Sequence, residues 1–539
     1  MKRIFITLSA LFTLLFCSVV FSNSGSLFQV TTTGAPALVS ITLCLNANAP
    51  VSCQDYNVSA LNLNISTTAP HQQYPYAGIK TNTPGYTIGN QGVDCTPLSN
   101  GYCLFSVSST TPKTVYISKN SGYVIGGLTA GLTSSGLILQ NNGGDNLAVA
   151  AAPEPTTFSF SSTVPFGGSY NVTVFQHPTG LTCTVVNASG TNVKADVTNV
   201  RVICHRPYAY VANYGDSNIS GYSINPTTGA LSTISSSPFP AGTNPFGIAI
   251  NPNGSFAYVT NSGSQNISVF AINTSTGALR EITGSPFAAG DVPSGIALSS
   301  NGHFAYVANN NGANISAYSI NTRTGALTPV QGSPFAAGSS PEYIALSPNG
   351  RFAYVTNTDD SNVSGYTINS TTGALTEIAG SPYSAGTSPR KIAVSSNGDF
   401  VYVANNSNDI SVYSINSITG ALTQITGSPF AAGNTPDGLA LSPNGNFAYV
   451  ANYAGGDISG YTINSITGAL TAMTGSPFAA GTNPFYIVIS SNGNFSYVTN
   501  NFDNNISGYS INSTTGALTA ITGSPFSAGS VPSGIALNW

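Results

Sequence analysis

The chain has 539 residues, only 6% of them charged, and a formal net charge of −4. This length exceeds that of one ordinary domain, and 27 tyrosines with 26 phenylalanines argue against a disordered chain, which would lack aromatic residues. Lys and Arg total 13 and form no basic cluster, which excludes a nucleic-acid-binding face.

The N-terminus carries the pattern of a secretory signal peptide. Two basic residues precede an apolar run over 4–21, and Val20 and Ser22 stand at the −3 and −1 positions of a cleavage site. We therefore predict that residues 1–22 are removed and that the protein is exported to the periplasm, the cell surface or the medium. An uncleaved anchor is the alternative, because the run is barely long enough to span a bilayer. After cleavage we expect no membrane span.

The next region, residues 23–119, alternates polar and apolar positions between Gly, Pro and Asn turns, which predicts a small β-sandwich-like module. Its four cysteines predict disulfides, since an exported chain is oxidised and no CxxC spacing suggests zinc. The short separations suit hairpin bridges, Cys44–Cys53 and Cys95–Cys103. A crossed pairing stays open, because sequence alone does not set connectivity.

Residues 120–204 form a second predicted module. The Gly-Leu-x-x-x-Gly-Leu run, the Asn141-Asn142-Gly143 turn and the last two cysteines resemble a small β-sandwich module of exported bacterial surface proteins. This resemblance implies a spacer or presentation role without chemistry. It also implies that Cys183 pairs with Cys204.

From residue 205 onward a Tyr-Val-(Ala/Thr)-Asn motif recurs every 47 or 48 residues. Its tyrosines are Tyr210, Tyr258, Tyr306, Tyr354, Tyr402, Tyr449 and Tyr497. Each unit contains four short strand patterns, here named A to D, with an Asn-Gly hairpin turn between A and B. We expect the Gly-Ser-Pro-Phe segment to lead from strand D to the next strand A. A period of this length with four strands predicts propeller blades.

The two ends of the array predict how the ring closes. The first Tyr-Val strand has no strand A before it, and the chain stops after an unaccompanied strand A over 533–539. The C-terminal strand should therefore complete the first blade, which removes exposed sheet edges. We predict an all-β protein with a seven-bladed propeller over 205–539.

The "YVTN" tetrads at 258–261, 354–357 and 497–500 resemble those of YVTN-type and lactonase-like seven-bladed propellers. In lactonase-type enzymes of that kind, the resemblance implies a pocket with histidine, arginine and an acid. The propeller here has only His205 at its start and His303 in an A–B turn. No Ser-His-Asp arrangement is visible, so enzymatic activity is uncertain and the sequence favours its absence.

Comparing the seven blades separates structural from specialised positions. The residue after the proline that opens strand A varies between blades and includes aromatic, small polar, acidic and basic side chains: Phe246, Ser294, Glu342, Arg390, Asp437, Phe485 and Ser533. The next residue also varies and includes Tyr343, Lys391 and Tyr486. We predict a pocket for an anionic or sugar-like ligand with Glu342, Tyr343, Arg390, Lys391 and Asp437 as its polar groups, and Phe246, Phe485 and Tyr486 as an aromatic wall. The alternative is a salt-bridge network around a wet channel.

Metal and cofactor sites are not expected. Calcium needs six to eight oxygen ligands, and no B–C loop shows an Asp-x-Asp-x-Asp ladder. The main functional hypothesis is a binding protein that recognises a protein, a glycan or a small ligand through its loop face. The alternatives are a lactone hydrolase of the 6-phosphogluconolactonase type and a structural surface-layer component.

Overall fold

The computed structural model describes residues 122–152 and 155–539 in full, and before them only the backbone of strands β1 to β11. The chain divides into two compact units, one over 1–179 and 183–204 and the other over 180–182 and 205–539. In the part of the chain that the structure describes, no helix is long and apolar enough to cross a membrane.

The first region contains two sheets. One runs in the order β1 (Phe5–Ile6), β2 (Ser18–Asn23), β3 (Ser26–Thr33), β6 (Asn62–Thr67), β11 (Lys113–Lys119) and β8 (Tyr86–Gly89). The other runs β5 (Cys53–Val58), β4 (Val39–Leu45), β7 (Tyr76–Thr81), β10 (Cys103–Ser106) and β9 (Thr96–Pro97). The backbone register places Cys44 opposite Cys53. The side chains of these cysteines lie outside the described part of the structure, so the predicted bridges Cys44–Cys53 and Cys95–Cys103 stay predictions.

The second region is a sandwich of two four-stranded sheets. One is β15 (Thr156–Ser159), β12 (Ile125–Ala130), β19 (Val197–His205) and β17 (Thr182–Val186); the other is β14 (Asp145–Val149), β13 (Leu137–Asn141), β16 (Tyr170–Gln176) and β18 (Ser189–Gly190). Alternate residues such as Ile125, Leu139 and Val200 are fully buried between them. The predicted Cys183–Cys204 disulfide is present and ties β17 to β19.

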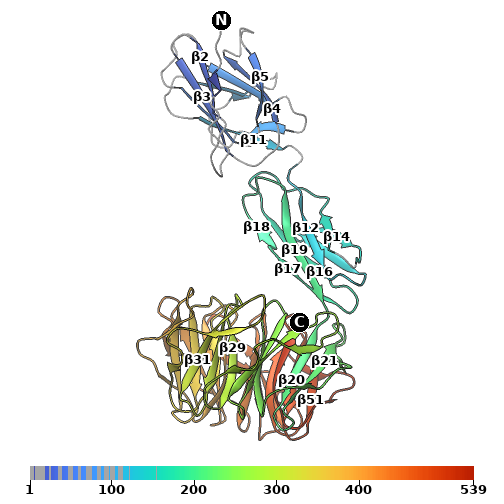
Figure 1. Ribbon diagram of the computed structural model, residues 1–539, viewed down its shortest axis with the longest axis vertical. Helices are drawn as coiled ribbons and strands as arrows, with labels where there is room; N and C mark the ends of the chain where they lie inside the picture. The colour runs from blue at the N-terminus through green and yellow to red at the C-terminus, as the bar shows by residue number, and fades with distance from the viewer. Residues whose placement is uncertain are drawn as a thin grey trace. The chain divides into compact units, whose positions relative to one another are not determined.

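The propeller has seven blades, numbered here from the N-terminus (Figure 1). Their innermost A strands, from blade 1 to blade 7, are β54 (Pro532–Asn538), β24 (Pro245–Ile250), β29 (Pro293–Leu298), β34 (Pro341–Leu346), β39 (Pro389–Val394), β44 (Pro436–Leu441) and β49 (Pro484–Ile489). The B strands are β20 (Tyr208–Asn213), β25 (Phe256–Asn261), β30 (Phe304–Asn309), β35 (Phe352–Asn357), β40 (Phe400–Asn405), β45 (Phe447–Asn452) and β50 (Phe495–Asn500). Each A strand contacts the next one, and β54 contacts β24, so the A strands form a closed ring.

The outer strands follow in the same blade order. The C strands are β21 (Asn218–Ile224), β26 (Asn266–Ile272), β31 (Asn314–Ile320), β36 (Asn362–Ile368), β41 (Asp409–Ile415), β46 (Asp457–Ile463) and β51 (Asn505–Ile511). The D strands are β22 (Leu231–Thr233), β27 (Leu279–Glu281), β32 (Leu327–Pro329), β37 (Leu375–Glu377), β42 (Leu422–Gln424), β47 (Leu470–Ala472) and β52 (Leu518–Ala520). A further two-residue strand follows each D strand: β23 (Phe239–Pro240), β28 (Phe287–Ala288), β33 (Phe335–Ala336), β38 (Tyr383–Ser384), β43 (Phe430–Ala431), β48 (Phe478–Ala479) and β53 (Phe526–Ser527).

These two-residue strands correct the expected path of the Gly-Ser-Pro-Phe segment. Instead of leading directly to the centre, its phenylalanine returns to the outer edge, where Phe287 pairs with Ile267 of strand C. Strand C has seven residues and strand D only three, so the start of strand C would otherwise lack an outer backbone partner. The chain crosses to the next blade only after this second pairing.

Ring closure follows the prediction from the ends of the array. β54 pairs antiparallel with β20, and Ala536 lies opposite Tyr210. In Figure 1 the green N-terminal strand β20 accordingly lies beside the red C-terminal strands.

The recurring tyrosine of strand B joins each blade to the next. Its buried hydroxyl donates to a glycine carbonyl in the C–D turn of the following blade, over 2.6–3.2 Å. The seventh of these bonds runs from Tyr497 in blade 7 to Gly229 in blade 1. The same motif thus builds the blade and closes the ring.

Candidate functional site

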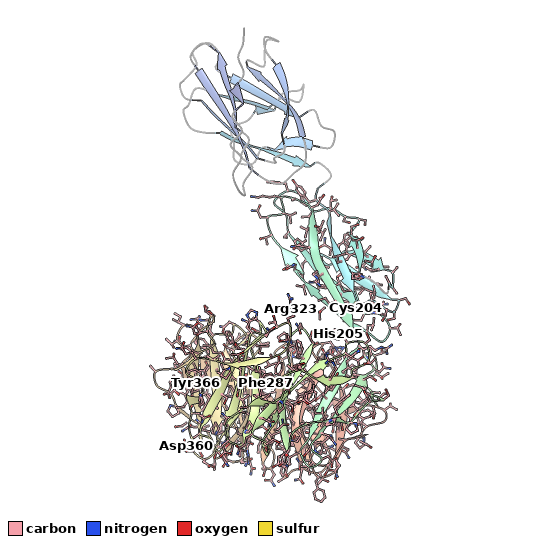
Figure 2. All side chains as sticks on the ribbon, in the orientation of Figure 1. Cys204, His205, Phe287, Arg323, Asp360 and Tyr366 are labelled. Carbon is pink, nitrogen blue, oxygen red and sulfur yellow. A yellow bond between two sulfur atoms is a disulfide. The ribbon has the colours of Figure 1, made fainter. Side chains whose placement is uncertain are left out.

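The specialised residues lie where the A strands begin. In each of blades 2 to 7 the opening proline pairs with the last residue of strand B, as Pro245 does with Asn261. The starts of the A strands therefore lie at the propeller face that carries the B–C loops. The A–B and C–D turns form the opposite face. Figure 2 shows this separation, with Asp360 of a B–C loop and Arg323 of a C–D turn at opposite ends of the propeller.

Blades 4 and 5 contribute an ion pair to this site. Arg390 Nη1 lies 2.5 Å from Glu342 Oε2, with the arginine side chain 29% exposed and the glutamate 7%. Burial alone would lower the pKa of Arg390, but the charges of Glu342 and Asp437 outweigh it and raise that pKa. The guanidinium therefore stays a cation between two acids.

Blade 6 contributes Asp437, a nearly covered carboxyl that is only 5% exposed. Burial and the negative charge of Glu342 raise its pKa to about 7, and the charges of Arg390 and Lys391 oppose that rise. A carboxyl with a pKa near neutrality exchanges a proton readily at physiological pH. This is the ionisation behaviour expected of a general acid or base.

Seven buried polar atoms of blades 4 to 6 have no hydrogen-bond partner, and four of them belong to residues at the start of an A strand or directly after a B strand. These four are Tyr343 Oη, Arg390 Nε, Asn406 Oδ1 and Asp437 Oδ1. The first two are donors, and the last two are acceptors when the acid is ionised. Since buried polar groups are almost always paired, such a group of unpaired atoms indicates a place for water or a polar ligand. All four atoms are covered, so a substrate reaches them only when a neighbouring side chain moves aside.

Aromatic rings from distant blades meet beside these polar groups. The ring of Phe246 in blade 2 lies 6.0 Å from that of Tyr343 in blade 4 and 5.7 Å from that of Phe485 in blade 7. The rings of Tyr343 and Tyr486 are 6.1 Å apart. Contacts between blades 2, 4 and 7 span the ring of A strands, so the aromatic groups meet across the propeller axis.

Lys391 is enclosed by two of these rings. Its Nζ lies 3.7 Å from the ring centre of Tyr486 and 4.6 Å from that of Tyr343, and it donates a hydrogen bond to Tyr486 Oη. Cation–π attraction and this hydrogen bond hold the ammonium in place. The structure thus brings all eight predicted residues into one region, although Tyr343, Glu342 and Asp437 are more deeply buried than a pocket wall requires.

Three further residues of this region were not predicted: Thr358, Asn406 and Tyr453. Each follows the last residue of a B strand. Thr358 Oγ1 contacts Glu342 Oε2 over 3.0 Å, and the ring of Tyr453 lies 6.3 Å from that of Phe485. The signal was present in the sequence, because this position also varies: Tyr214, Ser262, Asn310, Thr358, Asn406, Tyr453 and Asn501.

The histidine expected in a lactonase pocket does not reach this site. His303 lies in the A–B turn of blade 3, where its backbone nitrogen donates to Asn301, on the face opposite the cluster. Within residues 122–152 and 155–539, no group of three or more His, Cys, Asp or Glu residues is placed to hold a metal ion. Asp437 is the carboxyl of this cluster whose pKa lies near neutrality.

A family model described as "Lactonase, 7-bladed beta-propeller" matches residues 169–290, 199–340, 287–435 and 383–533, which together cover 169–533. The chain belongs to this lactonase family. The match confirms the resemblance seen in the YVTN tetrads. It also makes the main functional hypothesis wrong, since a lactonase family favours a lactone hydrolase over a binding protein.

Solved structures share the fold of this lactonase-family propeller. A candidate 6-phosphogluconolactonase from Bacteroides uniformis is 22% identical, with a TM-score of 0.55 over 62% of this chain and 99% of its own. Another from Bacteroides fragilis is 21% identical, with a TM-score of 0.55 over 62% and 98%. The periplasmic gluconolactonase of Pseudomonas aeruginosa is 19% identical, with a TM-score of 0.53 over 61% and 99%. No curated protein matches the chain.

Proposed function

We propose that the propeller hydrolyses a sugar lactone of the gluconolactone class at the cluster around Asp437. The observation that carries the proposal is a buried carboxyl with a pKa of about 7 beside a guanidinium, in a chain of the lactonase family. The names of the similar structures, a gluconolactonase and two candidate 6-phosphogluconolactonases, support the choice of substrate class.

In this mechanism, the oxygen of a water molecule attacks the lactone carbonyl carbon, and ionised Asp437 accepts a proton from that water. Arg390 donates hydrogen bonds to the carbonyl oxygen, which becomes an oxyanion, and Tyr343 adds a neutral donor. The carbonyl then re-forms and the ring C–O bond breaks. Protonated Asp437 returns its proton to the ring oxygen, so one lactone and one water yield one hydroxy acid.

The remaining polar residues hold these groups. Glu342 pairs with Arg390, which sets the direction of the guanidinium. The raised pKa of Arg390 keeps it charged throughout the cycle. Phe246, Phe485 and Tyr486 provide apolar surface against which one face of a sugar ring packs.

The test is hydrolysis of glucono-δ-lactone and of its 6-phosphate, corrected for the uncatalysed reaction. We expect Asp437→Asn, which has the same shape but accepts no proton, to lower kcat by at least about a hundredfold, as general bases contribute 10²–10⁴. The control, His303→Ala, changes an exposed turn on the opposite face and should keep full activity. Wild-type activity in Asp437→Asn, or none in the folded wild type, would refute the proposal.

A further inference from the structure

Thr358 is a buried residue directly after strand β35, and its hydroxyl lies between two acceptors. Oγ1 is 3.0 Å from Glu342 Oε2 and 3.1 Å from the backbone oxygen of Pro389. One hydroxyl proton is thus shared between a carboxylate and a carbonyl.

These two acceptors belong to the two halves of the ion pair. Glu342 stands on β34 of blade 4, and Pro389 directly precedes Arg390 on β39 of blade 5. Glu342 Oε2 accepts a hydrogen bond from the hydroxyl of Thr358 and another from Arg390 Nη1. The hydroxyl therefore links the carboxylate to the backbone segment that carries its guanidinium partner.

The same repeat position elsewhere shows what a purely structural hydroxyl does. Ser262 in blade 2 is also buried, and its Oγ donates to the backbone oxygen of Asn244 over 2.8 Å. It contacts no charged group within the hydrogen bonds that the structure describes. Thr358 instead contacts the backbone of the next blade, at Pro389, and in addition the carboxylate of Glu342.

We propose that Thr358 is a positioning residue, which fixes the Glu342 carboxylate and, through it, the Arg390 guanidinium over the reaction centre. The inference rests on the proposed function. Positioning matters here because a small displacement of a catalytic group lowers rate far more than it lowers stability. The charged and titratable groups around the reacting carboxyl are Glu342, Arg390, Lys391 and Tyr343.

The kinetic test uses three variants of the full chain. Thr358→Val removes the hydroxyl but keeps the shape, and it should lower kcat about tenfold or more with little change in KM. Thr358→Ser restores the hydroxyl and should recover activity to within about threefold. Ser262→Ala, the matched control, should stay within about twofold of wild type.

The pH profile separates positioning from packing. Arg390 opposes the rise in the pKa of Asp437, so a loosened guanidinium in Thr358→Val should shift the acidic limb of the rate profile to higher pH. The proposal would be overturned if the acidic limb of the Thr358→Val profile did not shift. It would also be overturned if Thr358→Val lost no more activity than Ser262→Ala, or if Thr358→Ser did not recover activity.

A second measurement does not depend on activity. Thr358→Val, Glu342→Gln and the double variant form a cycle of unfolding equilibria. Each variant is compared with wild type by the factor by which it raises the equilibrium constant for unfolding. If Thr358 holds Glu342, the factor for the double variant should be about fivefold smaller than the product of the factors for the two single variants. Independent, multiplicative effects would overturn the link. Absence of lactone hydrolysis in the wild type would instead refute the proposed function, while the cycle still decides the role of Thr358.

Discussion

Single side chains acquire their chemistry here from burial and from neighbouring charges. Asp437 and Asp409 are both aspartates of the propeller, but Asp409 accepts a hydrogen bond from Asn405 in a repeated structural contact. Asp437 instead lies buried near Glu342, which raises its pKa to about 7. The same residue type therefore stabilises a blade in one place and forms the proposed general base in another.

The raised pKa of Asp437 makes stability depend on pH. Its folded-state pKa of about 7 lies above the ordinary aspartate value of 3.8, so the folded protein binds this proton more tightly than the unfolded chain. The stability from this group is fully present below about pH 4 and is lost as pH rises through 7.

We therefore expect Asp437→Asn to gain stability relative to wild type as pH rises from about 4 to 7, although it loses activity. Thermal unfolding of both proteins across this range checks the prediction. A difference in Tm that stays constant with pH would contradict the raised pKa.

The sequence comparison between blades identified these residues but underestimated their burial. An exposed charge at a channel mouth changes stability by only tenths of a kcal/mol when it is removed. The structure buries its partner Glu342, so Arg390→Ala leaves an unpaired buried carboxylate, which typically costs about 3–5 kcal/mol. Loss of stability in that variant thus does not distinguish a catalytic pair from a structural one.

At the scale of elements, the loop between the outermost strand and the next strand A carries backbone strain. The residue before the opening proline has a left-handed backbone in every blade, with φ between 50° and 55°. Asn occupies this position in blades 2 and 7, and Val in blades 1 and 3. A β-branched side chain is unfavourable in that conformation, whereas Asn tolerates it. This strain lies two residues from the proposed site, as is common near functional groups.

Val292→Asn should consequently raise the stability of the propeller by about 1 kcal/mol. The asparagines at this position also donate to a loop carbonyl of the preceding blade, as Asn244 does to Tyr214 over 3.1 Å. Chemical denaturation checks the gain. The reverse variant Asn244→Val is the matched control and should lose stability by a similar amount. Equal stability of Val292→Asn and wild type would rule out strain at this position.

The strands were largely predictable because each repeat combines alternating apolar residues with Asn-Gly and Thr-Gly turns. Gly254, for example, adopts a φ of 71° in the A–B turn, a conformation that glycine accepts without penalty. The split outer strand was not predictable, because two residues such as Phe287 and Ala288 are too few for a periodic pattern. Their pairing depends on strand C having unpaired backbone groups, which is a tertiary property.

At the scale of the whole molecule, the repeated residues build and close the ring, and the residues that differ between blades form the proposed site. Counting strands at the two ends predicted the β54–β20 pairing, and the ring of tyrosine hydroxyls explains why the tetrad recurs. The reaction was harder to predict, because repetition reveals only what blades share. The sequence also showed no histidine near the cluster. Burial instead raises the pKa of Asp437 to about 7, the range in which histidine usually titrates.

The central claim is that Asp437 acts as the general base of lactone hydrolysis, and the pH dependence of kcat/KM tests it most directly. For glucono-δ-lactone, after subtraction of the uncatalysed rate, we predict a rise of about tenfold per pH unit below pH 7 and a plateau above it. Asp437→Asn should remove this pH-dependent rate. A profile that is flat between pH 5.5 and 8.5, or one that Asp437→Asn leaves unchanged, would contradict the account.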